Sequence, residues 1–169
     1  MSNVSQFIGS GWVPLETIEL TGAVTTVDFD SNIDDTFNNY VVTGTHTLSS
    51  SQSIRCQLKK DDPSPIITSG YRFLSTAPSA ATNSTTGNQS LAIIGQYSGS
   101  FIAYFMNLRS SDAFKSIVSQ MTGYTGSTMV ISSYTNALLD ASIINGIQIS
   151  VSSGNINTGK FTLYGIKEL

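Results

Sequence analysis

The closing stretch of the chain, Gly159-Lys160-Phe161-Thr162-Leu163-Tyr164-Gly165-Ile166, decides the fold. Phe161, Leu163 and Gly165 recur at every second position and so fall on one face of an extended segment, which is the period of a β-strand. A second alternating run, residues 147–151, precedes this stretch across a turn at residues 152–155. We interpret the two runs as a closing hairpin, and they predict a β-sandwich that is completed by its C-terminus.

The composition of the chain is poor in charge. Of its 169 residues, 11% are charged, against about 25% in a typical soluble domain. Serine, threonine, asparagine and glycine take the place of the charged residues, and with β-branched neighbours they favour sheet faces over helices. A surface with so little charge is weakly protected against association, which favours a defined oligomer or assembly partner over a free monomer.

Several classes of function are disfavoured by the same composition. The net charge is −3 with eight scattered lysines and arginines, whereas nucleic-acid binding needs clustered positive charge. No apolar run approaches the ~20 residues of a membrane-spanning helix, and the first residues lack the pattern of a signal peptide. Cys56 is the one cysteine and lies in phase with Ile54 and Leu58, so we expect a small buried hydrophobe.

The spacing of apolar runs and turns predicts an all-β, antiparallel, jelly-roll-like β-sandwich. Turn signals recur about every 8–12 residues, which favours about nine or ten strands. Polar starts followed by short apolar spacing predict one or two short helical turns, at residues 32–37 and 136–144. Gly44 marks a candidate bulge in the strand that holds it.

The domain organisation is a short arm followed by one domain. Residues 1–11 form the expected N-terminal arm, which carries two large apolar side chains, Phe7 and Ile8, before the flexible Gly9-Ser10-Gly11. Two interpretations remain open for the arm: a frayed terminus, or an attachment segment that docks on a neighbour. Residues 12–169 form the single β-sandwich domain.

No catalytic, metal or cofactor motif stands out. His46 is the only histidine, and we expect a strand residue with a half-exposed ring rather than a catalytic base. Asp34-Asp35 and Asp61-Asp62 lack the alternating spacing of a calcium loop. The former fits the start of a helical turn and the latter fits solvated loop charge. The sequence therefore predicts a protein that is not an enzyme and needs no cofactor.

Aromatic residues supply the candidate contact sites. Residues 99–108 are apolar on both faces, which predicts a central strand that is covered on both sides or meets another subunit. Its candidates for core or subunit contacts are Phe101, Tyr104, Phe105 and Met106. Tyrosines near the predicted loops at 76–88 and 123–126 are either strand ends with hydroxyls in water or sites where a sugar ring stacks. These candidate carbohydrate contacts are Tyr71, Tyr97, Tyr124 and Tyr134.

Motifs at both ends of the chain carry a family resemblance. They are Gly11-Trp12-Val13-Pro14-Leu15-Glu16, Val27-Asp28-Phe29, Ile33-Asp34-Asp35-Thr36-Phe37-Asn38-Asn39-Tyr40, Ser152-Ser153-Gly154-Asn155-Ile156 and the closing stretch at 159–166. With these motifs the chain resembles small tailed-bacteriophage virion proteins, often described as tail-fibre-like or minor structural proteins. The resemblance implies a jelly-roll module that trimerises on the particle surface.

Together these observations lead to one expected function and one alternative. We expect a non-enzymatic virion surface protein, a capsid-decoration protein or small fibre head, made in the host bacterial cytoplasm. Its expected partners are itself, as a homotrimer, and other capsid or tail proteins, which it meets through the arm. It is expected to bind no nucleic acid and to insert in no membrane. The alternative is a tail-fibre receptor-binding module that recognises host surface polysaccharide.

Overall fold

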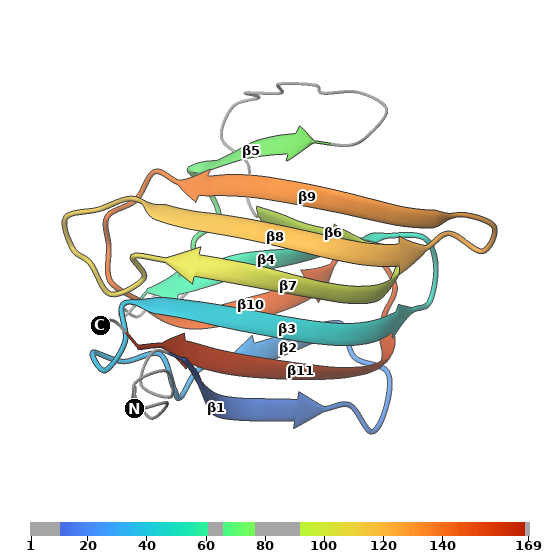
Figure 1. The fold of residues 1–169 in the computed structure, drawn as a ribbon, viewed down its shortest axis with the longest axis horizontal. Helices are drawn as coiled ribbons and strands as arrows, with labels where there is room; N and C mark the ends of the chain where they lie inside the picture. The colour runs from blue at the N-terminus through green and yellow to red at the C-terminus, as the bar shows by residue number, and fades with distance from the viewer. Residues whose placement is uncertain (1–10, 61–65, 77–91, 168–169) are drawn as a thin grey trace, which may run out of the picture.

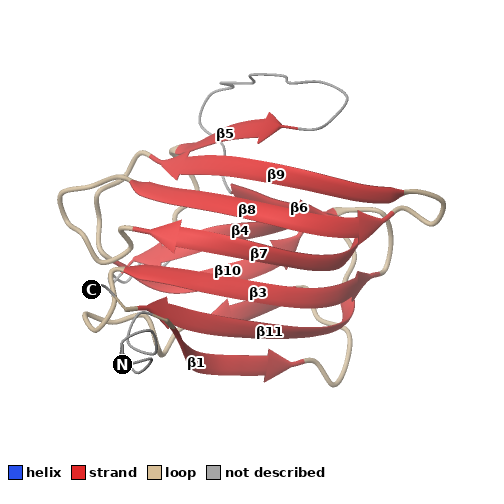
Figure 2. Ribbon diagram, in the orientation of Figure 1, coloured by secondary structure: helices blue, strands red, loops and turns tan. Residues whose placement is uncertain are grey.

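The protein is a β-sandwich of two antiparallel sheets, with no helix in the part of the chain that the structure describes (Figures 1 and 2). The structure is a computed structural model that describes residues 11–60, 66–76 and 92–167. Its eleven strands are β1 (Trp12–Glu19), β2 (Thr26–Phe29), β3 (Asn39–Leu48), β4 (Ser53–Lys60), β5 (Tyr71–Thr76), β6 (Ala92–Gln96), β7 (Ser98–Met106), β8 (Lys115–Tyr124), β9 (Met129–Leu138), β10 (Ile144–Val151) and β11 (Ile156–Ile166).

The two sheets differ in size. The large sheet has seven strands in the order β1-β11-β3-β7-β8-β9-β5, and the small sheet has four in the order β2-β10-β4-β6. From β1 to β7 each strand lies in the other sheet from the one before it, and only β7, β8 and β9 form a meander of hairpins within one sheet. The predicted all-β sandwich is confirmed, and its jelly-roll assignment stays a prediction.

The two closing strands do not form the predicted hairpin. β10 lies between β2 and β4 in the small sheet, whereas β11 lies between β1 and β3 in the large sheet. The turn at residues 152–155 carries the chain from one layer to the other, with Gly154 at a φ of 66°, which favours glycine. Alternation specifies which face of a strand is buried, but it does not specify which strand lies next to it.

The core fills the space between the inner faces of the sheets. β3 turns Tyr40 and Val42 inward, and β10 faces them with Ile147 and Ile149, all without solvent exposure. Each such side chain contributes about 1.5–3 kcal/mol to stability relative to an exposed position. Cys56 is also fully buried, as its phase predicted, and burial raises the pKa of its thiol.

Gly44 allows a close approach of aromatic rings and is not a bulge. Its pairing with Phe101 of β7 and Phe161 of β11 continues without a shift of register. A Cβ atom at Gly44 would lie 2.4 Å from Cε1 of Phe101 and 2.9 Å from Cδ1 of Phe161. The glycine is therefore required by packing of the two rings over the backbone, and the predicted bulge is wrong.

The predicted helical turns are also wrong, because their polar residues cap tight turns instead. The Asp34 carboxylate accepts the N–H of Thr36 at 2.9 Å, and the Tyr40 hydroxyl donates to the carbonyl of Asp34 at 2.8 Å. In the second segment the carboxylate of Asp140 accepts the N–H of Ser142 at 2.7 Å. Side chains that favour helix N-termini make the same local bonds in isolated turns, so the same polar residues are found at the start of a helix and in a turn without one.

Candidate functional site

The strand alternation divides the predicted subunit contacts into two pairs. Phe101 and Phe105 of β7 point into the core and are 5% and 0% exposed, so of the two roles predicted for them they have the core role and not the subunit contact. Tyr104 and Met106 lie on the opposite, outer face of the large sheet and are half-buried. β7 is central in its sheet, but only its inner face is covered by the other layer.

The outer face of the large sheet lacks charge across its centre. On the four adjacent strands β3, β7, β8 and β9, which are described throughout, no side chain on this face is charged. Charges appear only toward the two edges: Glu19 and Lys160 on β1 and β11, with an N–O distance of 4.0 Å, and Arg72 on β5.

The outer face of the small sheet is different, because charged side chains pair across it. Nζ of Lys59 lies 2.6 Å from the Asp28 carboxylate and 2.8 Å from that of Asp30. Burial acts to raise the pKa of Asp28, but hydrogen bonds from Lys59 and Gln148 outweigh it and hold that pKa below its usual value. One face of the sandwich thus carries paired charges, and the centre of the other face carries none.

An aromatic cluster covers one end of this uncharged face. The Trp12 ring lies 5.9 Å from Tyr104, edge to face, and 5.6 Å from Tyr164. Val41 lies between Tyr104 and Tyr164 in the ladder and is fully buried although it is on the outer face. The cluster therefore covers Val41, while Trp12 remains 42% exposed.

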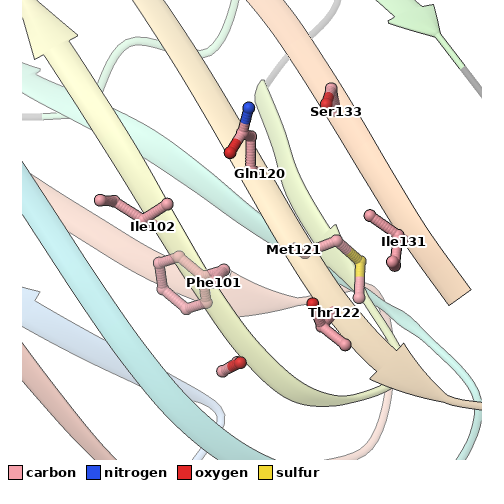
Figure 3. A pocket seen from close by; sticks show the side chains of 8 residues that line it. Phe101, Ile102, Gln120, Met121, Thr122, Ile131 and Ser133 are labelled. Carbon is pink, nitrogen blue, oxygen red and sulfur yellow. The ribbon is translucent and has the colours of Figure 1, made fainter. Parts of the chain in front are cut away.

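A shallow groove lies at the other end of the uncharged face, over β7, β8 and β9 (Figure 3). Its volume is about 390 Å³. Ile131 at its margin is 63% exposed, and the neighbouring Met129 is 69% exposed. The residues that line the groove are Ser100, Phe101, Ile102, Gln120, Met121, Thr122, Ile131 and Ser133.

The four tyrosines predicted to contact carbohydrate are not brought together as a group. Tyr71 and Tyr134 are 0% and 3% exposed and point into the core, so the predicted sugar contact is wrong for both. The Tyr71 hydroxyl instead accepts the backbone N–H of Leu58 at 2.8 Å. Tyr97 and Tyr124, in contrast, line one hollow of about 320 Å³ with Leu48, Ser50, Ser51, Ser98, Thr125 and Gly126.

Tyr97 forms the corner at which the chain passes from the small sheet to the large sheet. It is the single residue between β6 and β7, and its φ of 59° is uncommon for a residue with a side chain. Two hydrogen bonds hold this backbone: its N–H donates to the carbonyl of Gln52 at 2.7 Å, and its carbonyl accepts from His46 at 2.9 Å.

His46 is a buried structural residue, so the predicted half-exposed ring is wrong. It is 5% exposed, and its ring lies 5.8 Å from Phe101 and 6.3 Å from Phe161. Because the Tyr97 carbonyl can only accept, Nε2 carries the proton, and Nδ1 has no hydrogen-bond partner. Burial lowers the pKa of His46 despite this bond. Neither nitrogen contacts a carboxylate or a serine, as a catalytic triad would require.

The acidic pairs and the arm complete the predicted features. Asp34 closes a tight turn, and Asp35 pairs with Arg109 at 2.6 Å. Asp61, Asp62, Phe7 and Ile8 lie outside the described residues. Within the described ranges, no group of three or more histidine, cysteine, aspartate or glutamate side chains could hold a metal ion. The same part of the chain contains no helix that is long and apolar enough to cross a membrane.

The sequence matches no family profile, and no curated protein sequence matches it. The uncharged face and the tyrosine hollow are therefore assessed on their own chemistry. Sequence reasoning missed Ile102, Ile131 and the loop serines of the hollow. A signal for Ile131 was present, since no residue from Ser116 to Leu139 is charged.

Proposed function

We propose that this chain is a non-enzymatic structural protein of a bacteriophage particle surface. In this proposal it is a capsid-decoration protein or a small fibre head with a jelly-roll module. It assembles as a symmetric oligomer, a homotrimer, and docks on capsid or tail proteins through residues 1–11. The resemblance of both chain ends to small virion proteins supports the location on a phage particle. The uncharged outer face of the large sheet supports the assembly.

The uncharged face is the single observation that carries the proposed assembly. Charged side chains are depleted in the centre of protein interfaces, since burying an unpaired charge is costly. They are common on surfaces that remain in water, as on the small sheet of this molecule. Exposed apolar side chains such as Ile131 add area that is removed from water by a partner.

The size of the face is adequate for a stable contact. The four strands β3, β7, β8 and β9, spaced about 4.8 Å apart and about 30 Å long, span roughly 600 Å². A standard interface buries about 800 Å² per partner, so the uncharged centre supplies about three-quarters of one such contact and the strands at its margins supply the rest. A second copy fits the face better than a charged partner, because the face offers no charge to pair with.

The test compares two equally exposed apolar residues. Ile131→Lys places a charge on the uncharged face, and Phe114→Lys places one just before β8, outside the strands. The two side chains are 63% and 61% exposed, so neither change should unfold the monomer. Light scattering coupled to gel filtration should give a trimer for the wild type and Phe114→Lys, and a smaller species for Ile131→Lys.

A monomeric wild type at about 100 μM would overturn the proposed assembly. A dimer would overturn the proposed trimer but not the role of the uncharged face as a subunit contact. The proposed location on the surface of a phage particle is tested separately, by imaging intact particles. Density for this protein at a capsid symmetry axis or on the tail is expected. Its absence from purified particles would refute the virion proposal even if the protein trimerises.

A further inference from the structure

The hollow between Tyr97 and Tyr124 has the chemistry of a small binding site. Its eight lining residues include two aromatic rings and four hydroxyl side chains, from Ser50, Ser51, Ser98 and Thr125. Tyr124 is 56% exposed, so its ring is open to a ligand. No lining residue is charged, and Leu48 is the one aliphatic side chain among them.

Internal hydrogen bonds hold the backbone around the hollow in place. Tyr97 is held at its left-handed corner by bonds to Gln52 and His46, and such backbone persists only where its surroundings enforce it. Gln52 is 7% exposed; its amide nitrogen donates to Ser50 at 2.7 Å and its amide oxygen accepts the N–H of Ser153 at 2.7 Å. The opposite rim is closed by Thr125, whose backbone N–H donates to the carbonyl of Thr128 at 3.0 Å.

From this arrangement we infer that the hollow binds a short, neutral saccharide. The apolar face of a sugar ring packs against an aromatic ring, while the sugar hydroxyls exchange hydrogen bonds with serine and threonine hydroxyls. The hydroxyls of Ser50, Ser98 and Thr125 already bond Gln52, Leu48 and Thr128, but a hydroxyl has three hydrogen-bonding sites, so each keeps at least one for a sugar hydroxyl. A purely apolar ligand would use none of these sites, and an anionic ligand would find no positive charge. A volume of about 320 Å³ lies at the lower end of ligand pockets, which selects one or two sugar units.

This inference goes beyond the proposed structural role and does not depend on it. The hollow lies where the ends of β3, β7 and β8 meet, and Ile131 is not among the residues that line it. The Ile131→Lys variant should therefore bind the saccharide as the wild type does, even if it no longer assembles. Loss of assembly and loss of sugar binding are separate outcomes.

The experiment is a screen of the full chain on an array of neutral mono-, di- and polysaccharides, followed by calorimetric titration of each sugar that binds. Tyr124→Ala removes the exposed ring and should weaken binding at least tenfold. Ser51→Trp, at an exposed rim position, should block the hollow and abolish binding. Met129→Ala is the matched control, since Met129 lies opposite Tyr124 in the β8–β9 ladder but does not line the hollow, and it should bind within twofold of the wild type.

Two results would overturn the inference. One is the absence of binding to every neutral saccharide on the array. The other is binding within twofold of the wild type in both Tyr124→Ala and Ser51→Trp. Free disaccharides and immobilised polysaccharide of the same units should both bind, and recognition of the polymer alone would contradict the short ligand that the hollow is sized for.

Discussion

Replacing Gly44 with alanine is expected to destabilise the sandwich by about 2–3 kcal/mol, at the upper end of the range for overpacking a core. The added methyl group would lie 2.4 Å and 2.7 Å from two ring atoms of Phe101, and 2.9 Å from Phe161. Both rings are buried and pack against one another at 6.2 Å, so neither can move without disturbing its neighbours.

Urea denaturation followed by circular dichroism measures this change. For a domain of this size the loss corresponds to a melting temperature about 4–12 °C lower. Phe101→Leu removes the nearest ring atoms and should cost about 1–3 kcal/mol alone. In the double variant the two changes should compensate, so that its loss is smaller than the sum of the single losses by at least 1 kcal/mol.

The reasoning fails if Gly44→Ala lies within 0.5 kcal/mol of the wild type, taking that as the limit for a neutral surface change. It also fails if the double variant is strictly additive, because the alanine methyl would then not be meeting Phe101. Gly22→Ala is the control: a Cβ atom there has no neighbour within 4 Å, so its effect should be small.

The remaining predictions concern pH, a buried lysine and the arm. Burial lowers the pKa of His46 in the folded state, so the unfolded chain takes up a proton first and stability should fall as the pH drops below about 6.5. This slope in urea titrations should disappear in His46→Gln. Burial acts to raise the pKa of Asp140, but hydrogen bonds from Lys60 and Ser142 outweigh it and lower that pKa to about 2. The stability that the ionised carboxylate contributes should be complete above about pH 5 and should be lost as the pH falls from 3.8 toward about 2. The Asp140→Asn variant should lack this loss. Lys115 is fully buried and donates hydrogen bonds to the carbonyls of Ser110 and Ala113. Lys115→Met should therefore lower the free energy of unfolding, measured by heat or urea, by about 1–3 kcal/mol. An unchanged free energy of unfolding would show that those carbonyls find other partners. Deletion of residues 1–11 should leave a folded protein, by circular dichroism, that no longer attaches to particles; full occupancy by the truncated protein would refute the docking role of the arm.

Part of the candidate sites was predictable from local pattern. Apolar residues on both faces of 99–108 predicted a central strand, and β7 is central in the large sheet, with Tyr104 and Met106 on its outer face. Of the predicted tyrosines, Tyr97 and Tyr124 lie together because β6 ends at a corner beside the β8–β9 turn. Tyr71 and Tyr134 carry the same side chain near predicted loops, but their strands turn them inward.

Local sequence patterns specify the class of fold and which face of each strand is buried. The two-residue period of Phe161, Leu163 and Gly165 is a local property, and any sheet that covers one face will bury those residues. The same holds for Cys56 between Ile54 and Leu58. The central strands β3, β7, β8 and β9 hold one charged residue, Lys115 at the start of β8, and this scarcity of charge was visible in the sequence. The sequence did not show which face would be left uncharged.

Tertiary packing, by contrast, sets which strands lie side by side. Pairing depends on contacts between residues far apart in the chain, and alternation is compatible with many neighbours. Placement of β10 and β11 in different sheets therefore followed from packing, as did the approach of Phe101 and Phe161 over Gly44. The hollow of Tyr97 and Tyr124 likewise exists because a corner between two sheets meets a distant hairpin, which no local pattern specifies.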